Sequence, residues 1–241
     1  MHNVLLTGAG GHVGFALTKK YHAEGWRVFA TCLPKDRSTE LEALAEQSKD
    51  QIRLFDMDVT DAEDISRVAD SLKGQSIDVL FNVAGLTVHG DIEFGKTDYA
   101  MWNKHFAINT VGPMRICEAF APHVLRSVRK IMMTISSRIG ANPSYGFVGY
   151  RATKSAVSQV MFQVHLALRD QGVVACACHP GWVNTTNNGN KGALTPDQSA
   201  AMLFDVVDGL QPGDGGKFFE PDGSTLSIVT QQFDQKPYGM T

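Results

Sequence analysis

Short apolar runs alternate with amphipathic stretches along most of the chain. Runs rich in Val, Ile, Leu and Phe predict strands at 3–7, 27–31, 52–57, 77–82, 129–136, 172–179 and 216–220. Apolar positions with helical spacing predict intervening helices near 12–24, after Ser38, after Thr60, over about 98–124, and through Tyr150 to about Asp170. Continuous apolar strands separated by helices are typical of a parallel sheet that is covered on both faces.

Local signals mark where several of these helices begin. Ser38 precedes one helix, and Thr60 with Glu63 fits a capping box at the start of the next. Thr195 and Gln198 have the same spacing and flank a proline at the first helical position, so we expect a further helix there.

Right-handed crossovers between such strands give a doubly wound, Rossmann-like α/β fold with a parallel sheet of about seven strands. No linker, internal repeat or low-complexity tract interrupts the pattern, so we expect residues 1–241 to form a single domain. The last ten residues, QFDQKPYGMT, are expected to be an irregular tail.

Composition narrows the class of protein. An apolar content of 43% and a charged content of 20% are typical of a soluble globular protein. The net charge of −3 gives no electrostatic reason for a nucleic-acid or membrane partner, and no membrane span or secretory signal is evident. Four cysteines, at 32, 117, 176 and 178, lie in apolar surroundings, which indicates buried thiols and a cytoplasmic location.

The segment LLTGAGGHVG joins the first strand to the first helix. Glycines at this turn let the backbone approach a pyrophosphate, whose charge would be met by free N–H groups at the helix N-terminus. The position of the turn in a βαβ unit therefore indicates a dinucleotide site. A P-loop is not indicated, because no Gly-Lys-Ser/Thr follows.

The second strand ends without the carboxylate that commonly binds the adenosine ribose. Lys35 and Arg37 follow it instead. They either meet the 2′-phosphate of NADP or remain solvated loop cations. On this ground the sequence favours NADP(H) over NAD(H).

The segment GYRATK places Tyr150 and Lys154 one helical turn apart, on the same face of a helix. A free tyrosine, with a pKa of about 10, exchanges protons poorly near neutrality. A cation one turn away favours the phenolate and lowers that pKa. Taken alone, the spacing also fits an ordinary exposed Tyr–Lys pair.

Several motifs together resemble those of the short-chain dehydrogenase/reductase family, in that family's order: TGAGGHVG, DVTD, NVAG, NTVG, SSRIG, YRATK and PGWVNT. The resemblance extends from Thr7 to about Gly223. A finer similarity, in FATCLPKDRSTELEAL and LTPDQSAAMLFDVVDGL, is to the C-factor and sniffer-like carbonyl reductases. The resemblance implies an NAD(P)-dependent oxidoreductase that moves hydride between nicotinamide and a small carbonyl or alcohol compound.

The resemblance also implies site residues. Ser137 would hold the substrate oxygen, Tyr150 would be the general acid/base, Lys154 would also bind the nicotinamide ribose, and Asn109 would hold a water that links Lys154 to solvent. Cofactor contacts would come from Thr7, Gly8, Gly11, His12, Val13, Gly14, Lys35, Arg37, Asp58, Val59, Asn82, Ala84, Gly85, Tyr150, Lys154, Pro180, Gly181, Val183 and Thr185.

Two positions depart from the family pattern. His12 stands where the middle glycine is usual, although Gly8, Gly11 and Gly14 also fit the TGxxGxxG spacing of epimerase-like members. The His12 side chain could crowd a pyrophosphate or donate to it. Val83 replaces an asparagine of the NNAG segment.

The substrate region is short. TNNGNKGA is polar where longer relatives fold a helical lid, so we expect an open, shallow pocket. An apolar or aromatic substrate would contact Leu86, Phe147 and Trp182, each of which could instead belong to the core. His89 would lie at the edge of the pocket or be a surface or structural histidine. The histidines lack metal-ligand spacing, and no metal site is expected.

Two other functions remain open. The first is a non-catalytic NAD(P)-binding protein with a signalling or redox-sensing role, since fold does not fix function. The second, a nucleotide-sugar epimerase, is suggested by the glycine spacing, but the chain is short for a separate sugar-binding region.

Apolar helix faces near 98–124 and 150–170 could pair in a homodimer or homotetramer.

Overall fold

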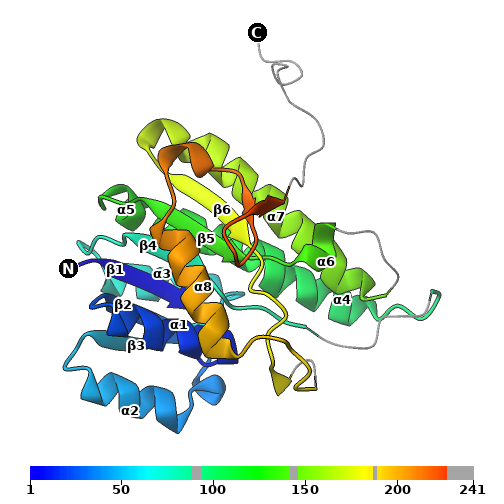
Figure 1. The fold of residues 1–241 in the computed structure, drawn as a ribbon, viewed down its shortest axis with the longest axis horizontal. Helices are drawn as coiled ribbons and strands as arrows, with labels where there is room; N and C mark the ends of the chain where they lie inside the picture. Colours follow the sequence, from blue (N-terminus) through cyan, green and yellow to red (C-terminus); the bar gives the residue numbers. More distant parts are fainter. Residues whose placement is uncertain (88–93, 142–145, 187–188, 227–241) are drawn as a thin grey trace.

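A computed structural model describes residues 1–87, 94–141, 146–186 and 189–226. In this described part, eight strands form one sheet in the order β3-β2-β1-β4-β5-β6-β7-β8 (Figure 1). Neighbouring strands are parallel except for β7 and β8, which are antiparallel. The strands are β1 Asn3–Thr7, β2 Arg27–Cys32, β3 Ile52–Asp56, β4 Val79–Asn82, β5 Ile131–Ile135, β6 Val174–Cys178, β7 Phe218–Phe219 and β8 Thr225–Leu226.

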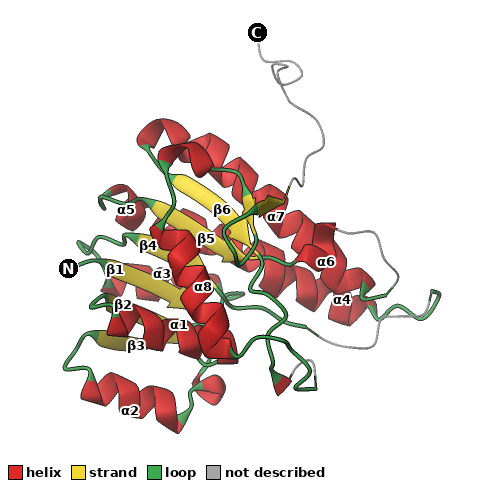
Figure 2. Ribbon diagram, viewed as in Figure 1, coloured by secondary structure: helices red, strands yellow, loops and turns green. Residues whose placement is uncertain are grey.

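Helices connect the strands (Figure 2). They are α1 His12–Ala23, α2 Thr39–Gln47, α3 Ala62–Ser71, α4 Tyr99–Phe106, α5 Gly112–Leu125, α6 Arg138–Ala141, α7 Val148–Leu168 and α8 Pro196–Asp208. None of them, within the described residues, is both long enough and apolar enough to cross a membrane.

The helices cover both faces of the sheet, as continuous apolar strands predict. One apolar core packs α1, α2 and α8 on the sheet through Tyr21, Leu41 and Phe204. The core on the other face includes Phe120 of α5 and Met161 of α7. The doubly wound α/β fold is thereby confirmed, and the four cysteines are buried and free, as expected.

Several helix starts agree with the sequence. The Ser38 hydroxyl accepts from the Leu41 N–H, and Thr195 with Gln198 forms a complete capping box at α8. The predicted box of Thr60 and Glu63 is wrong. Asp61 caps α3 instead, because its carboxylate accepts from the backbone N–H groups two and three residues later.

The region predicted as one helix over 98–124 is divided. Between α4 and α5 the chain makes a π-helical turn at 107–111. Such a turn carries one extra residue and often occurs at functional sites. It holds Asn109, which is buried. The irregular tail and His89 lie outside the described residues.

The strand order reverses beside β1, which lies between β2 and β4. Open α/β sheets bind ligands at such a switch point, beyond the carboxyl ends of the strands. The Thr7 hydroxyl ties these ends together, accepting from the N–H groups of Val83 and Ala84 over 3.0 and 3.1 Å. The fold therefore directs attention to this edge.

The corrected α3 cap can be tested. We expect Asp61→Ala to lower the free energy of unfolding by about 1 kcal/mol, because two N–H groups lose their acceptor. Glu63→Ala should have a much smaller effect. Urea unfolding measures the free energy of unfolding of both variants. A larger decrease in Glu63→Ala than in Asp61→Ala would favour the capping box predicted for Thr60 and Glu63.

Candidate cofactor and active site

A cavity of about 790 Å³ follows the carboxyl ends of β1, β2, β3 and β4. Its walls are formed by segments from the glycine loop, the ends of β2 and β3, the segment after β4, α4 with the π-turn, and Thr185. The lining residues are Gly8, Gly10, Gly11, His12, Val13, Gly14, Cys32, Leu33, Lys35, Asp36, Met57, Asp58, Val59, Thr60, Val83, Ala84, Gly85, Leu86, Thr87, Lys104, Ala107, Ile108 and Thr185.

The glycine loop fits a bound dinucleotide phosphate. A Cβ on Gly14 would lie 2.1 Å from the Gly8 carbonyl oxygen, so the loop can fold tightly only with glycine there. Helix α1 has Gly11 at its N-cap and no side-chain cap, which leaves its first N–H groups to an anion in the cavity. His12 begins the helix, with an exposed side chain at the cavity wall.

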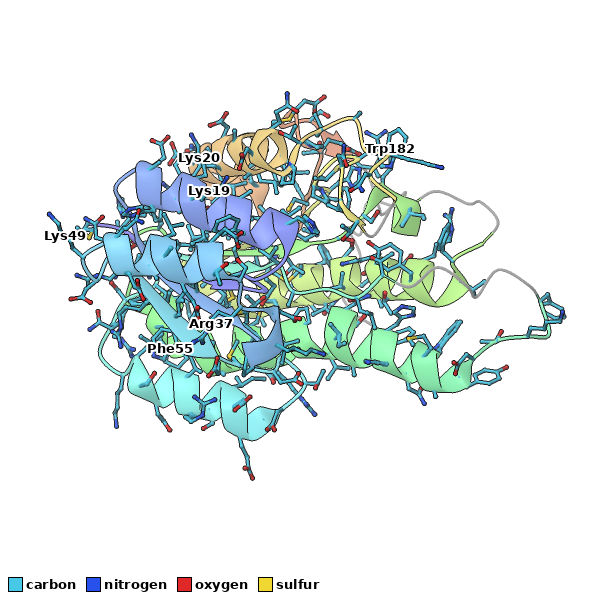
Figure 3. All side chains as sticks on the ribbon, turned by 90° about the horizontal axis from the view of Figure 1, so that it is seen from below. Lys19, Lys20, Arg37, Lys49, Phe55 and Trp182 are labelled. Carbon is cyan, nitrogen blue, oxygen red and sulfur yellow. The ribbon has the colours of Figure 1, made fainter. Side chains whose placement is uncertain are left out.

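The two cations predicted to follow β2 lie in different environments. Lys35 lines the cavity together with the neighbouring Asp36. Arg37 does not line it, because its guanidinium forms an ion pair with Asp56 of β3 and hydrogen-bonds the thiol of Cys32. Figure 3 shows Arg37 near Phe55, the residue before Asp56.

The other predicted cofactor residues divide in the same way. Those that line the cavity are Gly8, Gly11, His12, Val13, Gly14, Lys35, Asp58, Val59, Ala84, Gly85 and Thr185. Those that do not are Thr7, Arg37, Asn82, Tyr150, Lys154, Pro180, Gly181 and Val183. Thr7 and Asn82 are buried, and the Asn82 amide donates to the Thr134 hydroxyl over 3.1 Å, so both side chains fasten strand ends together.

Tyr150 lies in the first turns of α7, near the end of β5. Its hydroxyl is hydrogen-bonded to the hydroxyls of Thr87 and Ser137. Burial raises the pKa of the phenol above its ordinary value, and these two hydrogen bonds partly offset that effect. Thr87 lies outside every motif named above, so no sequence pattern pointed to it.

Lys154 is buried directly behind Tyr150. Its Nζ lies 5.6 Å from the centre of the Tyr150 ring and donates to the Ile135 carbonyl over 2.8 Å. Burial lowers the pKa of the ammonium to about 8. The expected drop in the Tyr150 pKa is not found in the protein alone, because desolvation dominates at the phenol.

Asn109 is fully engaged by its neighbours. Its amide exchanges hydrogen bonds with the Leu86 backbone, over 2.7 and 2.9 Å, and donates to Thr153 over 3.2 Å. A Cβ on Gly85 would lie 3.5 Å from the Asn109 Oδ1 and 3.7 Å from the Lys154 Nζ. Asn109 therefore shapes the chain segment that faces Lys154.

The predicted substrate residues are dispersed. Leu86 lines the cavity, and Phe147 is half-buried just before α7 with φ +54°. Trp182 is 58% exposed and extends from the surface (Figure 3). The prediction for His89 falls outside the described residues.

The depressed pKa of Lys154 has a consequence for stability. Between about pH 8 and pH 10.5 the unfolded chain holds a proton that the native ammonium has lost, so the wild-type protein gains stability as the pH rises. Lys154→Met lacks this gain. We expect the difference in unfolding free energy to change by about 3 kcal/mol across that window, at 1.36 kcal/mol per pKa unit.

Urea unfolding across the pH series measures the difference. Lys49→Met, at an exposed lysine, is the control and should follow the wild type. Parallel pH curves for the wild type and Lys154→Met would contradict a buried, destabilised ammonium.

Comparisons with known proteins agree on one family. The profile of a family described as short chain dehydrogenase matches residues 2–194. The chain is 33% identical to the C-signal protein of Myxococcus xanthus over 153 residues, which are 62% of this chain and 92% of that protein.

Two solved structures are similar over nearly the whole chain. Carbonyl reductase Sniffer of D. melanogaster has a TM-score of 0.87 at 24% identity, covering 94% of this chain and 99% of its own. A short-chain dehydrogenase/reductase from Burkholderia multivorans with bound NADP has a TM-score of 0.83 at 27% identity, covering 93% and 98%. This chain therefore belongs to the short-chain dehydrogenase/reductase family and is an NAD(P)-dependent enzyme of that family.

Proposed function

We propose that the enzyme transfers hydride between nicotinamide and the carbonyl or hydroxyl-bearing carbon of a small apolar or aromatic compound, with Tyr150 as general acid/base. The observation that carries the proposal is the group of three hydroxyls, from Tyr150, Ser137 and Thr87, beside the cavity. Lys154 supports this group from the protein interior. A protein that only binds nucleotide has no need of such an arrangement.

In the reducing direction, the Tyr150 hydroxyl gives its proton to the substrate oxygen as the carbonyl carbon gains a hydride. The Ser137 hydroxyl donates a hydrogen bond to the same oxygen and stabilises the negative charge that develops there. When bound, the nicotinamide cofactor supplies or accepts the hydride and, in its oxidised form, adds a positive charge. Thr87 holds the phenol oxygen in place.

The protonation state of the site fits the proton transfer that reduction needs. Burial raises the pKa of Tyr150, so the phenol carries its proton at neutral pH. A protonated phenol is the form that reduction requires. With its pKa lowered to about 8, Lys154 is mostly still a cation at neutral pH and can stabilise the phenolate left behind.

NADP(H) is the proposed cofactor. Lys35 is the predicted cation that lines the cavity at the end of β2, where the adenosine ribose binds in this fold. The related Burkholderia multivorans structure has NADP bound. The Asp36 carboxylate beside Lys35 opposes a 2′-phosphate, which makes Lys35 the residue on which the preference depends.

Location and assembly complete the proposal. Four buried, unpaired cysteines are compatible with a reducing, cytoplasmic environment. Val111, the last residue of the π-helical turn before α5, and Leu166, on α7, expose apolar side chains, which supports a homodimer or homotetramer formed through these helices. One domain spanning residues 1–241 remains our interpretation.

Loss of the Tyr150 hydroxyl tests the proposed chemistry. We expect Tyr150→Phe to lower kcat/KM for NADPH-dependent reduction of aldehydes, ketones and quinones by roughly 100-fold or more, because no group remains to protonate the oxygen. NADPH oxidation followed across the substrate panel measures it. Tyr99→Phe, at an exposed tyrosine, should behave as wild type. Tight NADPH binding without turnover of any compound would favour the sensing function instead.

Cofactor preference gives a separate test. We expect Lys35→Ala to lower kcat/KM with NADPH about tenfold, since one charge-assisted contact to phosphate is lost, and to leave NADH nearly unchanged. Steady-state kinetics with both cofactors measure the ratio, and Lys49→Ala is the matched surface control. An equal loss with NADH and NADPH would show that Lys35 does not read the 2′-phosphate.

A further inference from the structure

Arg138 and Glu220 form an ion pair with two hydrogen bonds, and Arg138 is the chain neighbour of Ser137, one of the three hydroxyl-bearing residues described above. Arg138 follows Ser137 in the chain, and Glu220 follows β7. The Arg138 Nε and Nη2 donate to the two carboxylate oxygens of Glu220 over 3.0 and 2.8 Å. This is the parallel geometry in which a guanidinium binds a carboxylate most specifically.

The Glu220 carboxylate is buried, so it depends on Arg138 for its hydrogen bonds. The Glu220 side chain is only 8% exposed, whereas that of Arg138 is 56% exposed. A carboxylate removed from water needs a partner that satisfies both oxygens. Arg138 supplies both donors from one rigid plane, which a lysine ammonium cannot do.

The pair joins strand ends that contribute to the site. The Ser136 N–H donates to the Cys178 carbonyl over 2.7 Å, which links the end of β5 to the end of β6. The His179 N–H donates to Phe219 over 2.8 Å, which links β6 to β7. The Arg138–Glu220 pair spans the same three strand ends from outside, between the segment after β5 and the segment after β7.

Pro221 continues this contact to the loop after β6. Gly181 has φ +84°, and a Cβ placed on it would lie 3.4 Å from the Pro221 ring. Leu194 packs closer still to Gly181, and the Ser199 hydroxyl donates to the Pro180 carbonyl over 2.6 Å. Pro221 is thus one of the neighbours of this loop, through which a shift of Glu220 would reach the proposed nicotinamide contact.

Ser137 is fastened from the opposite side by α7. The Arg151 Nη1 donates to the Ile139 carbonyl over 2.7 Å, and the Ser155 hydroxyl donates to the Gly140 carbonyl. These contacts hold α6, the short helix after Ser137, against α7. The Arg138–Glu220 pair holds the start of that helix toward β7, so Ser137 lies between two attachments.

We propose that Arg138 and Glu220 are a positioning pair for the reaction. The pair fixes Ser137 relative to Tyr150 and fixes the Pro180–Gly181 loop relative to the cofactor, without touching the reacting atoms itself. The proposal rests on the function proposed above for Ser137. It assigns a role in the reaction to Arg138, the residue after Ser137 in SSRIG, and to Glu220, which lies outside the motifs named above.

Substitution of either partner should lower turnover more than stability. We expect Arg138→Lys, which keeps the charge but loses the two-point geometry, and Glu220→Gln to lower kcat about tenfold, since small displacements of a catalytic group cost that much or more. The matched control is Arg129→Lys. Arg129 lies just before β5, at the amino ends of the strands and away from the site, and its Nη1 is 2.6 Å from an Asp208 carboxylate oxygen. Its substitution should leave kcat unchanged.

A double-mutant cycle separates positioning from general damage. If the pair acts through Ser137, Glu220→Gln should cost less than about twofold in kcat when Ser137 is already alanine. Thermal unfolding identifies any variant that fails to fold, in which case Arg138→Lys, which retains the charge, carries the test. Unchanged kcat in the folded single variants, or the same loss in the Ser137→Ala background, would overturn the proposal.

Binding of NADPH distinguishes failure of this proposal from failure of the proposed function. We expect Arg138→Lys and Glu220→Gln to weaken NADPH binding about threefold or more, measured by nicotinamide fluorescence without any substrate, and Arg129→Lys to bind normally. A wild-type protein without turnover would refute the function, and the positioning of the loop would still be tested by these affinities. Wild-type affinity in both variants would overturn that part of the proposal.

Discussion

A buried ammonium holds the longest helix of the fold against the centre of the sheet. The Nζ of Lys154 donates to the Ile135 carbonyl, where β5 ends, and the Ser136 hydroxyl donates to the Lys154 carbonyl over 2.8 Å. These two bonds fix where α7 crosses the end of β5. Tyr150 lies one turn earlier on the helix, so the same bonds bring its hydroxyl to Ser137. Burying a cation costs free energy, which is expressed in the lowered pKa of Lys154.

The remainder of the site is built from strand ends and the loops that follow them. Parallel pairing brings the carboxyl ends of β1, β2, β3 and β4 to one edge, where glycines and helix N–H groups line a cavity suited to a dinucleotide. Thr7, Asn82 and Asn109 contribute by hydrogen-bonding neighbouring segments rather than by lining the cavity. Several family motif positions therefore support the site from within the protein.

Much of the fold could be predicted from the sequence, because buried parallel strands are continuous apolar runs and helices between them are amphipathic. What could not be predicted depends on tertiary contacts. Thr60 and Asp61 are adjacent and both suit a helix cap, so only the path of the chain decides between them. Arg37 looks like a phosphate ligand until the fold brings Asp56 beside it.

The candidate site follows the same division. The sequence predicted the glycine loop and the Tyr150–Lys154 pair, because each has a fixed spacing within one loop or one helix, and the family resemblance added Ser137. It missed Thr87, which only tertiary packing brings to Tyr150, and it gave no sign of the π-helical turn at Asn109. The prediction from sequence that the Tyr150 pKa is lowered in the protein alone was also wrong. The spacing shows the nearby cation, but it does not show the burial that raises the pKa.

The central claim is that Tyr150 exchanges protons under the control of buried Lys154 and the bound cofactor. Its most direct test is the tyrosinate absorbance of the wild type minus that of Tyr150→Phe, titrated with pH in the absence and presence of NADP⁺. We expect Tyr150 to ionise above its ordinary pKa in the protein alone and at a clearly lower pH with NADP⁺ bound, with the lowering reduced in Lys154→Met. Ionisation at the same pH with and without NADP⁺, or an unaltered lowering in Lys154→Met, would contradict the account.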